Sequence, residues 1–146
     1  MPIRETMCFE SVYEECLRLS EGDKKRIIFD GVAAWMFVDG LLAGESYGAT
    51  PAKLDAEMPD VPQNDSLCID CYSSTVLPQF QGRGLGKVLV AYWNGLARGS
   101  GFTKVAGHAT DPRIVAVRSF FGVRFGAVHQ NWYGTTRTAH YYEGDL

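Results

Sequence analysis

Long apolar runs, a basic excess and a leader segment are all missing from this 146-residue sequence. No stretch approaches the roughly 20 apolar residues that cross a membrane, and the N-terminal residues carry Arg4 and Glu5 instead of the apolar run of a signal peptide. The 14 basic residues are outnumbered by 17 acidic ones, giving a net charge of −3, whereas general nucleic-acid binders are normally basic. We therefore expect a cytoplasmic protein without a membrane or nucleic-acid partner. The acidic balance mildly favours a cationic amine as substrate.

Cysteine is also scarce. The four residues, Cys8, Cys16, Cys68 and Cys71, are not preceded by a segment that would direct them to an oxidising compartment, so we expect them to be reduced. Cys68 and Cys71 have the spacing of half a metal site, but no second pair follows at zinc-ribbon spacing and the flanking residues have the pattern of a strand. The sequence therefore predicts no metal site and no metal cofactor.

Repeats, low-complexity tracts and interdomain linkers are absent as well, and the length suits a single domain over residues 1–146. Asp39-Gly40 between two apolar runs predicts a β-hairpin with strands at 32–38 and 41–47. Further strands are expected at 67–77, 102–109, 123–133 and 138–143, with a very short one at 2–4.

Apolar residues at helical spacing predict helices from Phe9 to Leu17 and from Leu85 to Leu96, with a shorter one over 24–29. A further helix is expected to start after Asp111 as its N-cap and to run to residue 121, with Gly122 as its C-cap. Strands alternating with helices in this order predict an α/β fold (α+β by some schemes), with a mixed sheet flanked by helices.

A glycine-rich loop at residues 81–87 stands between an expected strand and an expected helix. Alternating glycines open backbone N–H groups to a ligand and the helix N-terminus lies behind them, so the loop predicts an anion site suited to a diphosphate. The glycines are Gly82, Gly84 and Gly86, and Arg83 and Lys87 could add charge at the rim. Their spacing excludes a Walker loop and a dinucleotide fingerprint. The alternative is a turn that only caps the helix.

Residues 76–87 resemble the acetyl-CoA motif of the GNAT superfamily of N-acetyltransferases, which is Gln/Arg-x-x-Gly-x-Gly/Ala after a strand ending in Val-x-Pro. Gln81, Gly84 and Gly86 match its fixed positions, and the family's element order fits from near Ile3 to about Tyr142, more weakly outside the motif. The resemblance implies a mixed, mostly antiparallel sheet that splays between its fourth and fifth strands, here 67–77 and 102–109. It implies acetyl-CoA contacts at Val76, Gln81, Gly82, Arg83, Gly84, Leu85, Gly86, Lys87 and Asp111.

The resemblance also implies the reaction. Acetyl-CoA would serve as cosubstrate, and a primary amine, either a small amine or a peptide amine, would attack it directly in a ternary complex. Pantetheine would pair with the fourth strand at Val76, and a nearby backbone N–H would polarise the thioester carbonyl, so no cysteine nucleophile is needed. A non-catalytic acyl-CoA-binding module and a phosphate-binding protein of another α/β fold are the competing interpretations. Dimers are common in that family, so a homodimer is one option.

Two residues are candidates for the general base that helps a neutral amine to attack. Asp70 lies eleven residues before the glutamine of the motif, where the histone-acetyltransferase branch of the family carries a glutamate. Strand alternation would place Asp70 on one face with Tyr72, Ser74 and Val76. His108, near the end of the fifth strand, would stand across the splay. For both candidates a purely structural role is the alternative.

The tyrosine that often protonates the leaving thiolate in that family has no counterpart here. One register places Arg118 at its position and the other places Phe120. The acid would then be another group or water, with Tyr133, Tyr141 and Tyr142 as substitutes.

Residues 48–66, which contain three prolines, are expected to form a mobile loop that borders the acceptor side as a lid would. Trp35, Tyr47, Trp132 and Tyr133 predict an aromatic acceptor pocket, with core packing as the alternative.

Overall fold

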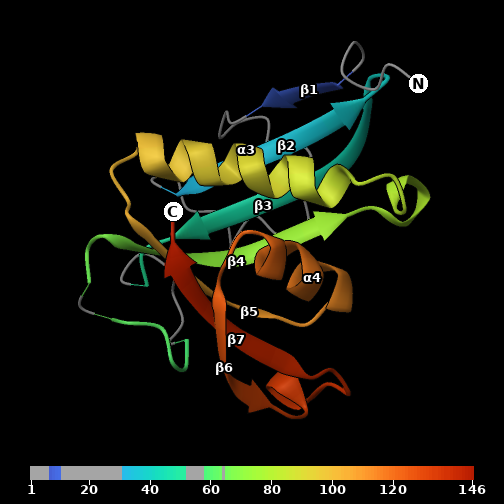
Figure 1. The fold of residues 1–146 in the computed structure, drawn as a ribbon. Helices are drawn as coiled ribbons and strands as arrows, with labels where there is room; N and C mark the ends of the chain where they lie inside the picture. The colour runs from blue at the N-terminus through green and yellow to red at the C-terminus, as the bar shows by residue number, and fades with distance from the viewer. Residues whose placement is uncertain (1–6, 11–30, 52–57, 64) are drawn as a thin grey trace.

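The computed structural model describes residues 7–10, 31–51, 58–63 and 65–146 (Figure 1). Its strands are β1 (Met7–Glu10), β2 (Val32–Val38), β3 (Leu41–Ala49), β4 (Cys68–Val76), β5 (Lys104–Ala109), β6 (Arg124–His129) and β7 (Ala139–Asp145). Its helices are α3 (Leu85–Gly99) and α4 (Pro112–Phe120), with short 3-10 helices η2 (Pro78–Phe80) and η3 (Trp132–Gly134). Within these ranges no helix is both long and apolar enough to cross a membrane.

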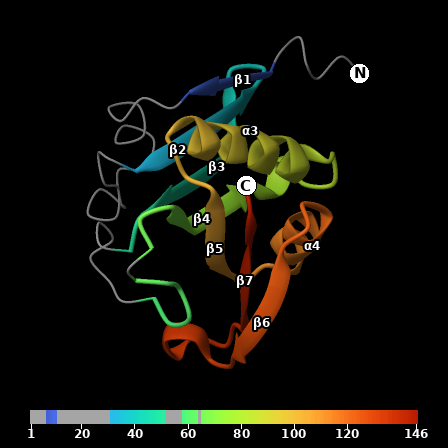
Figure 2. The same ribbon diagram turned by 60° about the vertical axis from the view of Figure 1, so that its left-hand side comes forward.

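The seven strands form one sheet in the order β1-β2-β3-β4-β5-β7-β6. Neighbouring strands are antiparallel except for β4 and β5, which are parallel. α3 runs across β2 and β3 and α4 lies next to it (Figures 1 and 2), and both helices contribute to one apolar core on this face of the sheet. The expected mixed, mostly antiparallel sheet flanked by helices is confirmed.

Local sequence explains the central hairpin and the long helix. Asp39 and Gly40 both have positive φ, 52° and 77°, as the tight turn between β2 and β3 requires. α3 buries Leu89 and Trp93 against the sheet, and the Trp93 indole N–H donates to the carbonyl oxygen of Val32 at 2.9 Å. The helix is therefore fixed to β2 by both packing and a buried hydrogen bond.

β1 corrects the expectation for the N-terminal residues. Phe9, expected to begin a helix, lies in β1 opposite Met36 of β2. Apolar spacing in a short segment fits a strand as well as a helix, and pairing with a neighbouring strand decides between them. The remainder of that helix, the helix over 24–29 and the strand at 2–4 lie outside the described residues.

β3 extends through Ala49, so the first two residues of the expected loop at 48–66 belong to a strand. The close approach of β4 at Gly48 requires glycine, because a Cβ there would lie 2.4 Å from the carbonyl oxygen of Asp70 and 2.8 Å from the Trp93 ring.

A β-bulge interrupts the pairing of β3 with β4. Tyr47 lies opposite Ser73 but the next residue, Gly48, lies opposite Cys71, so Tyr72 is the extra residue of the bulge. A bulge shifts the alternation of side chains by one position, and the second half of β4 is therefore turned over relative to the first.

The bulge overturns one prediction. Asp70 and Tyr72 do not share a face with Ser74 and Val76: the Ser74 hydroxyl lies 3.4 Å from the thiol of Cys71, and Cys71 and Val76 both pack into the core beneath α3. Tyr72 packs into an apolar cluster on the opposite face. Sequence alternation could not reveal this reversal, because a bulge depends on the pairing partner.

β4 and β5 pair only over the first part of β4. Parallel pairing runs from Cys68 and Lys104 to Cys71 and Gly107, after which the strands part. A Cβ at Gly107 would lie 2.9 Å from the carbonyl oxygen of Cys71, so glycine permits the last close approach. The expected splay between the fourth and fifth strands is confirmed.

Candidate functional site

The loop before α3 presents bare backbone to solvent. Gly82 and Gly84 have φ of 80° and 75°, and a Cβ added to either would meet nothing within 4 Å. Gly84 is the N-cap of α3 and supplies no side-chain cap. The first N–H groups of the helix are therefore left facing open space, which is the arrangement that binds an anion.

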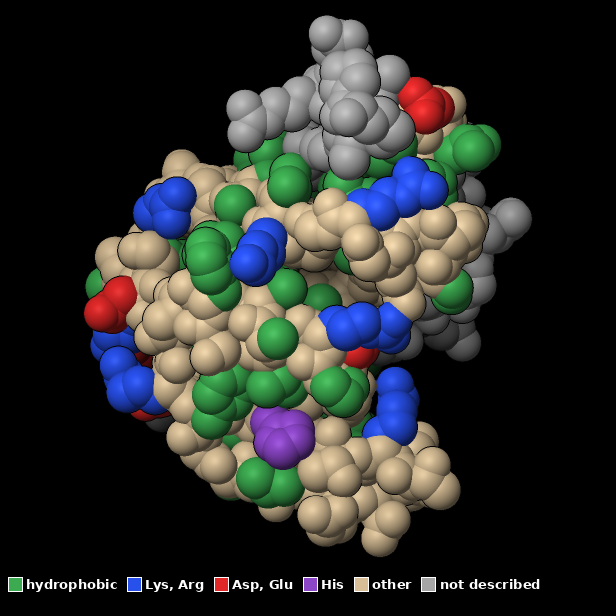
Figure 3. Space-filling view, turned by 45° about the vertical axis from the view of Figure 1, so that its right-hand side comes forward, with side chains coloured by type: hydrophobic (Ala, Val, Ile, Leu, Met, Phe, Trp, Pro, Cys, Tyr) green, Lys and Arg blue, Asp and Glu red, His purple; other side chains and the backbone are tan. Residues whose placement is uncertain are grey.

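A cavity of about 240 Å³ adjoins this loop. All but one of the residues expected to contact acetyl-CoA line it: Val76, Gln81, Gly82, Gly84, Leu85, Gly86, Lys87 and Asp111. The exception is Arg83, whose guanidinium lies 5.5 Å from the centre of the Phe80 ring. Two basic residues, Lys87 and Arg113, line the cavity beside one acidic residue, Asp111, and Figure 3 shows Lys and Arg side chains spread over one face of the molecule. The loop and its surroundings thus suit a phosphorylated ligand.

Arg113 joins this site although the sequence did not single it out. Its guanidinium donates to the side-chain oxygen of Gln81 and to the carboxylate of Asp111. Asp111 also caps α4 as expected, accepting from the Arg113 backbone N–H at 2.9 Å. A signal was available, because an arginine in the first turn of a helix opposes the helix dipole unless something else holds it there.

Gln81 has a supporting role in this arrangement. Its side-chain amide donates to the carbonyl oxygen of Val76 at 2.9 Å while its oxygen accepts from Arg113. The glutamine therefore ties the end of β4 to the glycine loop and to α4, and the anion site itself is left to backbone N–H groups.

A second cavity, of about 230 Å³, fills the gap where β4 and β5 part. Residues 71–75 of β4 line one side and residues 108–110 the other, with Trp132 and Tyr133 at its edge. Asp111 and Ile114 line both this cavity and the one beside the glycine loop. The two cavities are therefore adjacent, one beside the glycine loop and the other in the splay.

Asp70 lies beside the point where the strands part. It is opposite Ala106 in the pairing, one position before the last pair. The side chain is fully buried, and its carboxylate oxygens have no hydrogen-bond partner among the described residues. Burial raises the pKa of Asp70 to about 7. Asp70 does not line the splay cavity itself, so it lies immediately behind the wall.

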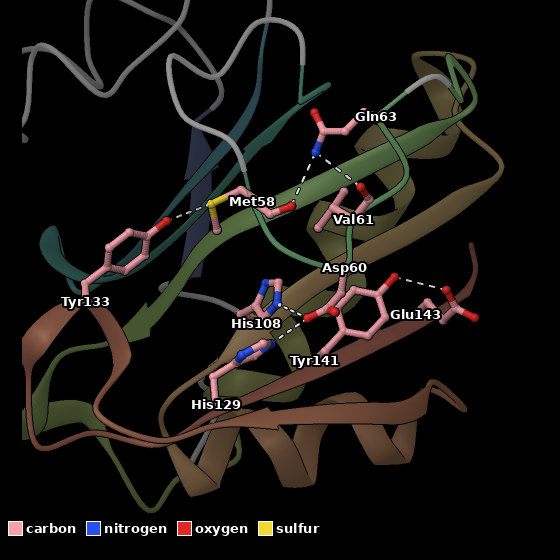
Figure 4. Close-up of polar contacts among 9 residues, drawn as sticks. All are labelled: Met58, Asp60, Val61, Gln63, His108, His129, Tyr133, Tyr141 and Glu143. Carbon is pink, nitrogen blue, oxygen red and sulfur yellow. Dashed lines mark hydrogen bonds and ion pairs between the residues drawn. The ribbon is translucent and has the colours of Figure 1, made fainter.

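His108 does line the splay cavity. Its ring stacks on Trp132 with the ring centres 4.7 Å apart, and its Nε2 lies 3.1 Å from a carboxylate oxygen of Asp60 (Figure 4). Burial is the main influence on the pKa of His108 and lowers it. The structure thus places His108 in the wall of the splay cavity and Asp70 one pair before the point where β4 and β5 part.

Neither of the two alignment registers places a hydroxyl at the position of the missing tyrosine. Arg118 is fully buried, where Nη1 donates to Asn94 at 3.0 Å and Nη2 donates to the Cys71 thiol at 3.0 Å. Phe120 is 64% exposed, with the Lys87 ammonium 4.2 Å from its ring centre. Arg118 therefore belongs to the core and Phe120 to the surface.

The substitute tyrosines differ in their access to the splay. Tyr133 and Tyr142 line the cavity, whereas Tyr141 does not. Complete burial raises the pKa of Tyr142 well above its ordinary value, and burial together with the Glu143 carboxylate raises that of Tyr141. Tyr133 is 68% exposed, and its hydroxyl donates to the sulfur of Met58 at 3.5 Å.

Three further expectations concern side chains around the site. Cys68 and Cys71 form no disulfide and pack into separate clusters on opposite faces of the sheet, so they do not form a shared metal site. Trp35 and Tyr47 lie in small clusters of their own and do not line the splay cavity. Met58, from the loop at 48–66, does line it, so this part of the loop borders the gap as expected; motion of the loop stays a prediction.

No family model and no curated protein matches the sequence. Solved structures do match. An acetyltransferase from Bacillus cereus described as acting on IAA is 15% identical with a TM-score of 0.70, covering 96% of this chain and 99% of that one. A GNAT family acetyltransferase from Elizabethkingia anophelis, solved with acetyl-CoA bound, is 12% identical with a TM-score of 0.67, covering 97% and 99%.

An Arabidopsis thaliana protein solved with a bisubstrate analogue is 15% identical with a TM-score of 0.67, covering 97% of this chain and 99% of that one. At sequence identities this low, the similarity shows a shared fold and does not identify the substrate. The alignments span nearly the whole chain, and the structure contains the splay and the glycine loop that the sequence predicts. The chain therefore has the fold of the GNAT acetyltransferases.

Proposed function

We propose that the protein is an N-acetyltransferase that transfers the acetyl group of acetyl-CoA to a primary amine. The observation that carries this proposal is that the cavity beside the glycine loop and the cavity in the splay adjoin each other, with Asp111 and Ile114 in the walls of both. The diphosphate of CoA would bind the N–H groups around Gly84, and Lys87 and Arg113 would supply positive charge at the rim.

The thioester would lie in the gap between β4 and β5. A backbone N–H at the edge of β4 would stabilise the negative charge that develops on the carbonyl oxygen. The nitrogen of the neutral amine forms a bond to the carbonyl carbon as the carbon–sulfur bond breaks, CoA leaves as the thiolate, and the nitrogen loses one proton to give the amide. Direct attack leaves Cys71, which contacts Arg118, outside the chemistry.

We assign Asp70 as the general base that accepts the proton lost by the amine nitrogen. A carboxylate with a pKa of about 7 is half ionised near neutral pH, which suits a general base. Its oxygens have no hydrogen-bond partner among the described side chains, so they are available to a proton donor. Because Asp70 lies behind the cavity wall, one water would relay the proton from the amine.

We infer the class of acceptor from the aromatic side chains at the edge of the splay cavity. Trp132 and Tyr133 line the cavity there, and aromatic faces attract cationic amines before they lose their proton. A small amine or a peptide amine fits this rim. The cytoplasmic location and the homodimer remain predictions. Sedimentation velocity would test whether the protein is a dimer.

A non-catalytic acyl-CoA-binding module is the competing function, because neither Arg118 nor Phe120 supplies the hydroxyl that would protonate the thiolate. The two functions differ in one measurable product. An active enzyme releases free CoA thiol from acetyl-CoA when a library of amines is supplied, whereas a binding module releases none above the protein-free rate.

Replacing Asp70 with asparagine tests the assignment. Asp70→Asn keeps the size of the side chain but cannot accept a proton, so turnover should fall about 10²–10⁴-fold. CoA affinity, measured by calorimetry, should barely change, because Asp70 does not line the cavity beside the glycine loop. Asp65→Asn is the matched control, since Asp65 forms an ion pair with Lys104 at the surface.

The defect in Asp70→Asn should shrink as pH rises, because more of the amine is then already neutral. Full activity in Asp70→Asn together with impaired His108→Ala would transfer the base role to His108. Two fully active variants would mean that solvent accepts the proton.

A further inference from the structure

Three side chains from distant parts of the chain converge at the outer edge of the splay. Asp60 lies in the loop before β4, His108 in β5 and His129 at the end of β6 (Figure 4). One carboxylate oxygen of Asp60 lies 3.1 Å from Nε2 of His108 and 2.6 Å from Nε2 of His129. All three groups place a potential ligand atom within 4.8 Å of the others.

The three groups are held by their surroundings. His108 is 1% exposed at its side chain, stacked on Trp132, and its second ring nitrogen, Nδ1, is buried without a partner among the described residues. Asp60 has a φ of 71°, a left-handed conformation that aspartate adopts more readily than most residues other than glycine. A buried ring nitrogen without a described partner, in a convergent polar cluster, is a reason to ask what the cluster binds.

The exposure of the cluster is uneven. The side chains of Asp60 and His129 are each about one-third exposed, at 30% and 31%, while His108 forms the buried side. An ion held between them would keep one side open to water. This is the pattern of a site with three protein ligands and an open fourth position.

We infer that Asp60, His108 and His129 form a binding site for a divalent transition-metal ion of the zinc class. Two imidazole nitrogens and one carboxylate oxygen suit Zn²⁺ or Co²⁺, whereas Mg²⁺ and Ca²⁺ prefer oxygen ligands throughout. Ligands about 2.0–2.2 Å from a tetrahedral ion lie roughly 3.3 Å from one another. The Asp60–His108 separation of 3.1 Å is already close to that value, the Asp60–His129 separation of 2.6 Å would have to widen, and all three ligand atoms lie within 4.8 Å of one another.

The metal would join the loop before β4 to β5 and β6, two strands that pair with β7 and not with each other. Asp60 belongs to the described loop at 58–63, and the two histidines belong to β5 and β6. Met58 of the same loop and His108 both line the splay cavity, so the ion would fix one wall of that cavity. Binding of the metal stands independently of the acetyl-transfer proposal.

The chain supplies its own control, because it has three histidines and only His140 lies outside the cluster. The experiment titrates protein, first freed of metal with a chelator, with Co²⁺ and follows the visible absorption of the bound ion. Zn²⁺ is then added to displace it. The intact protein and His140→Ala should both develop the absorption with one ion per chain.

His129→Ala and Asp60→Asn should lose the absorption. Loss of a partner that only orients a metal ligand already weakens affinity about 10–100-fold, so loss of a ligand should weaken it by at least ~100-fold. Circular dichroism of each variant checks that it is folded. No absorption in the intact protein, or equal affinity in His129→Ala and the intact protein, would overturn the inference and leave a hydrogen-bonded cluster only.

Discussion

Replacing Gly84 should affect both folding stability and CoA binding. Its φ of 75° is costly for any other residue, and the space where a side chain would project is empty. Gly84→Val should therefore lose roughly 1–2 kcal/mol of folding stability through backbone strain and abolish CoA binding by filling the approach to the helix N-terminus. Calorimetry with CoA measures the second effect.

Gly101 offers the matched control for that strain. It has a φ of 97°, a Cβ added there would meet nothing within 4 Å, and it lies beyond the opposite end of α3. Gly101→Val should show a similar loss of stability with CoA affinity unchanged. Equal CoA affinities in the two variants would show that the loop before α3 does not hold the diphosphate.

Among the elements, α4 depends on one buried arginine. Arg118 satisfies Asn94 and the Cys71 thiol and lies over the rings of Trp93 and Tyr142. Arg118→Ala should cost about 2–5 kcal/mol, because it leaves a cavity and two polar groups without their donor. Chemical denaturation measures this difference.

Two comparisons make the prediction for α4 specific. Arg118→Lys should recover little, since an ammonium lacks the planar fork that reaches both acceptors. Arg98→Ala, at an exposed position in the last turn of α3, should change stability by less than about 0.5 kcal/mol. A cost for Arg118→Ala no greater than that for Arg98→Ala would contradict a central role for Arg118 in anchoring α4.

Elements that depend on neighbouring residues could be predicted, and those that depend on distant partners could not. The turn at Asp39 and the capping of α4 by Asp111 use local backbone chemistry, which the sequence displays directly. β1 and the bulge at Tyr72 are set by the strands alongside them. For the same reason the sequence indicated His108 but not its convergence with Asp60 and His129.

At the scale of the whole molecule, the buried carboxylate of Asp70 should make stability depend on pH. Its pKa is about 7 in the folded protein and about 3.9 in an unfolded chain. Since the raised value favours the protonated form, its contribution is complete below about pH 4 and is lost as pH rises to about 7. The loss is at most about 4 kcal/mol, from three units at about 1.4 kcal/mol each.

Asp70→Asn removes this titration, so the variant should gain stability relative to the unmodified protein between pH 4 and pH 7. Urea denaturation of both proteins across that range measures the difference. A constant difference at every pH would mean that Asp70 is ionised throughout and is stabilised by a group outside the described residues. The same substitution is expected to remove activity, so stability and turnover should move in opposite directions.

The bulge at Tyr72 has a consequence for how the sequence of β4 can vary over time. Substitutions along the strand change one side chain each, and loss of Tyr72 itself would leave every later pair with β3 in place, because Tyr72 is the residue without a partner in the register. Loss of Ser74 would instead exchange the environments that follow: Thr75, now exposed, would take the core-facing place of Ser74, and Val76 would turn toward solvent. A library of single-residue deletions should therefore tolerate loss of Tyr72 better than loss of Ser74, which makes the bulge the place where the length of this strand can change.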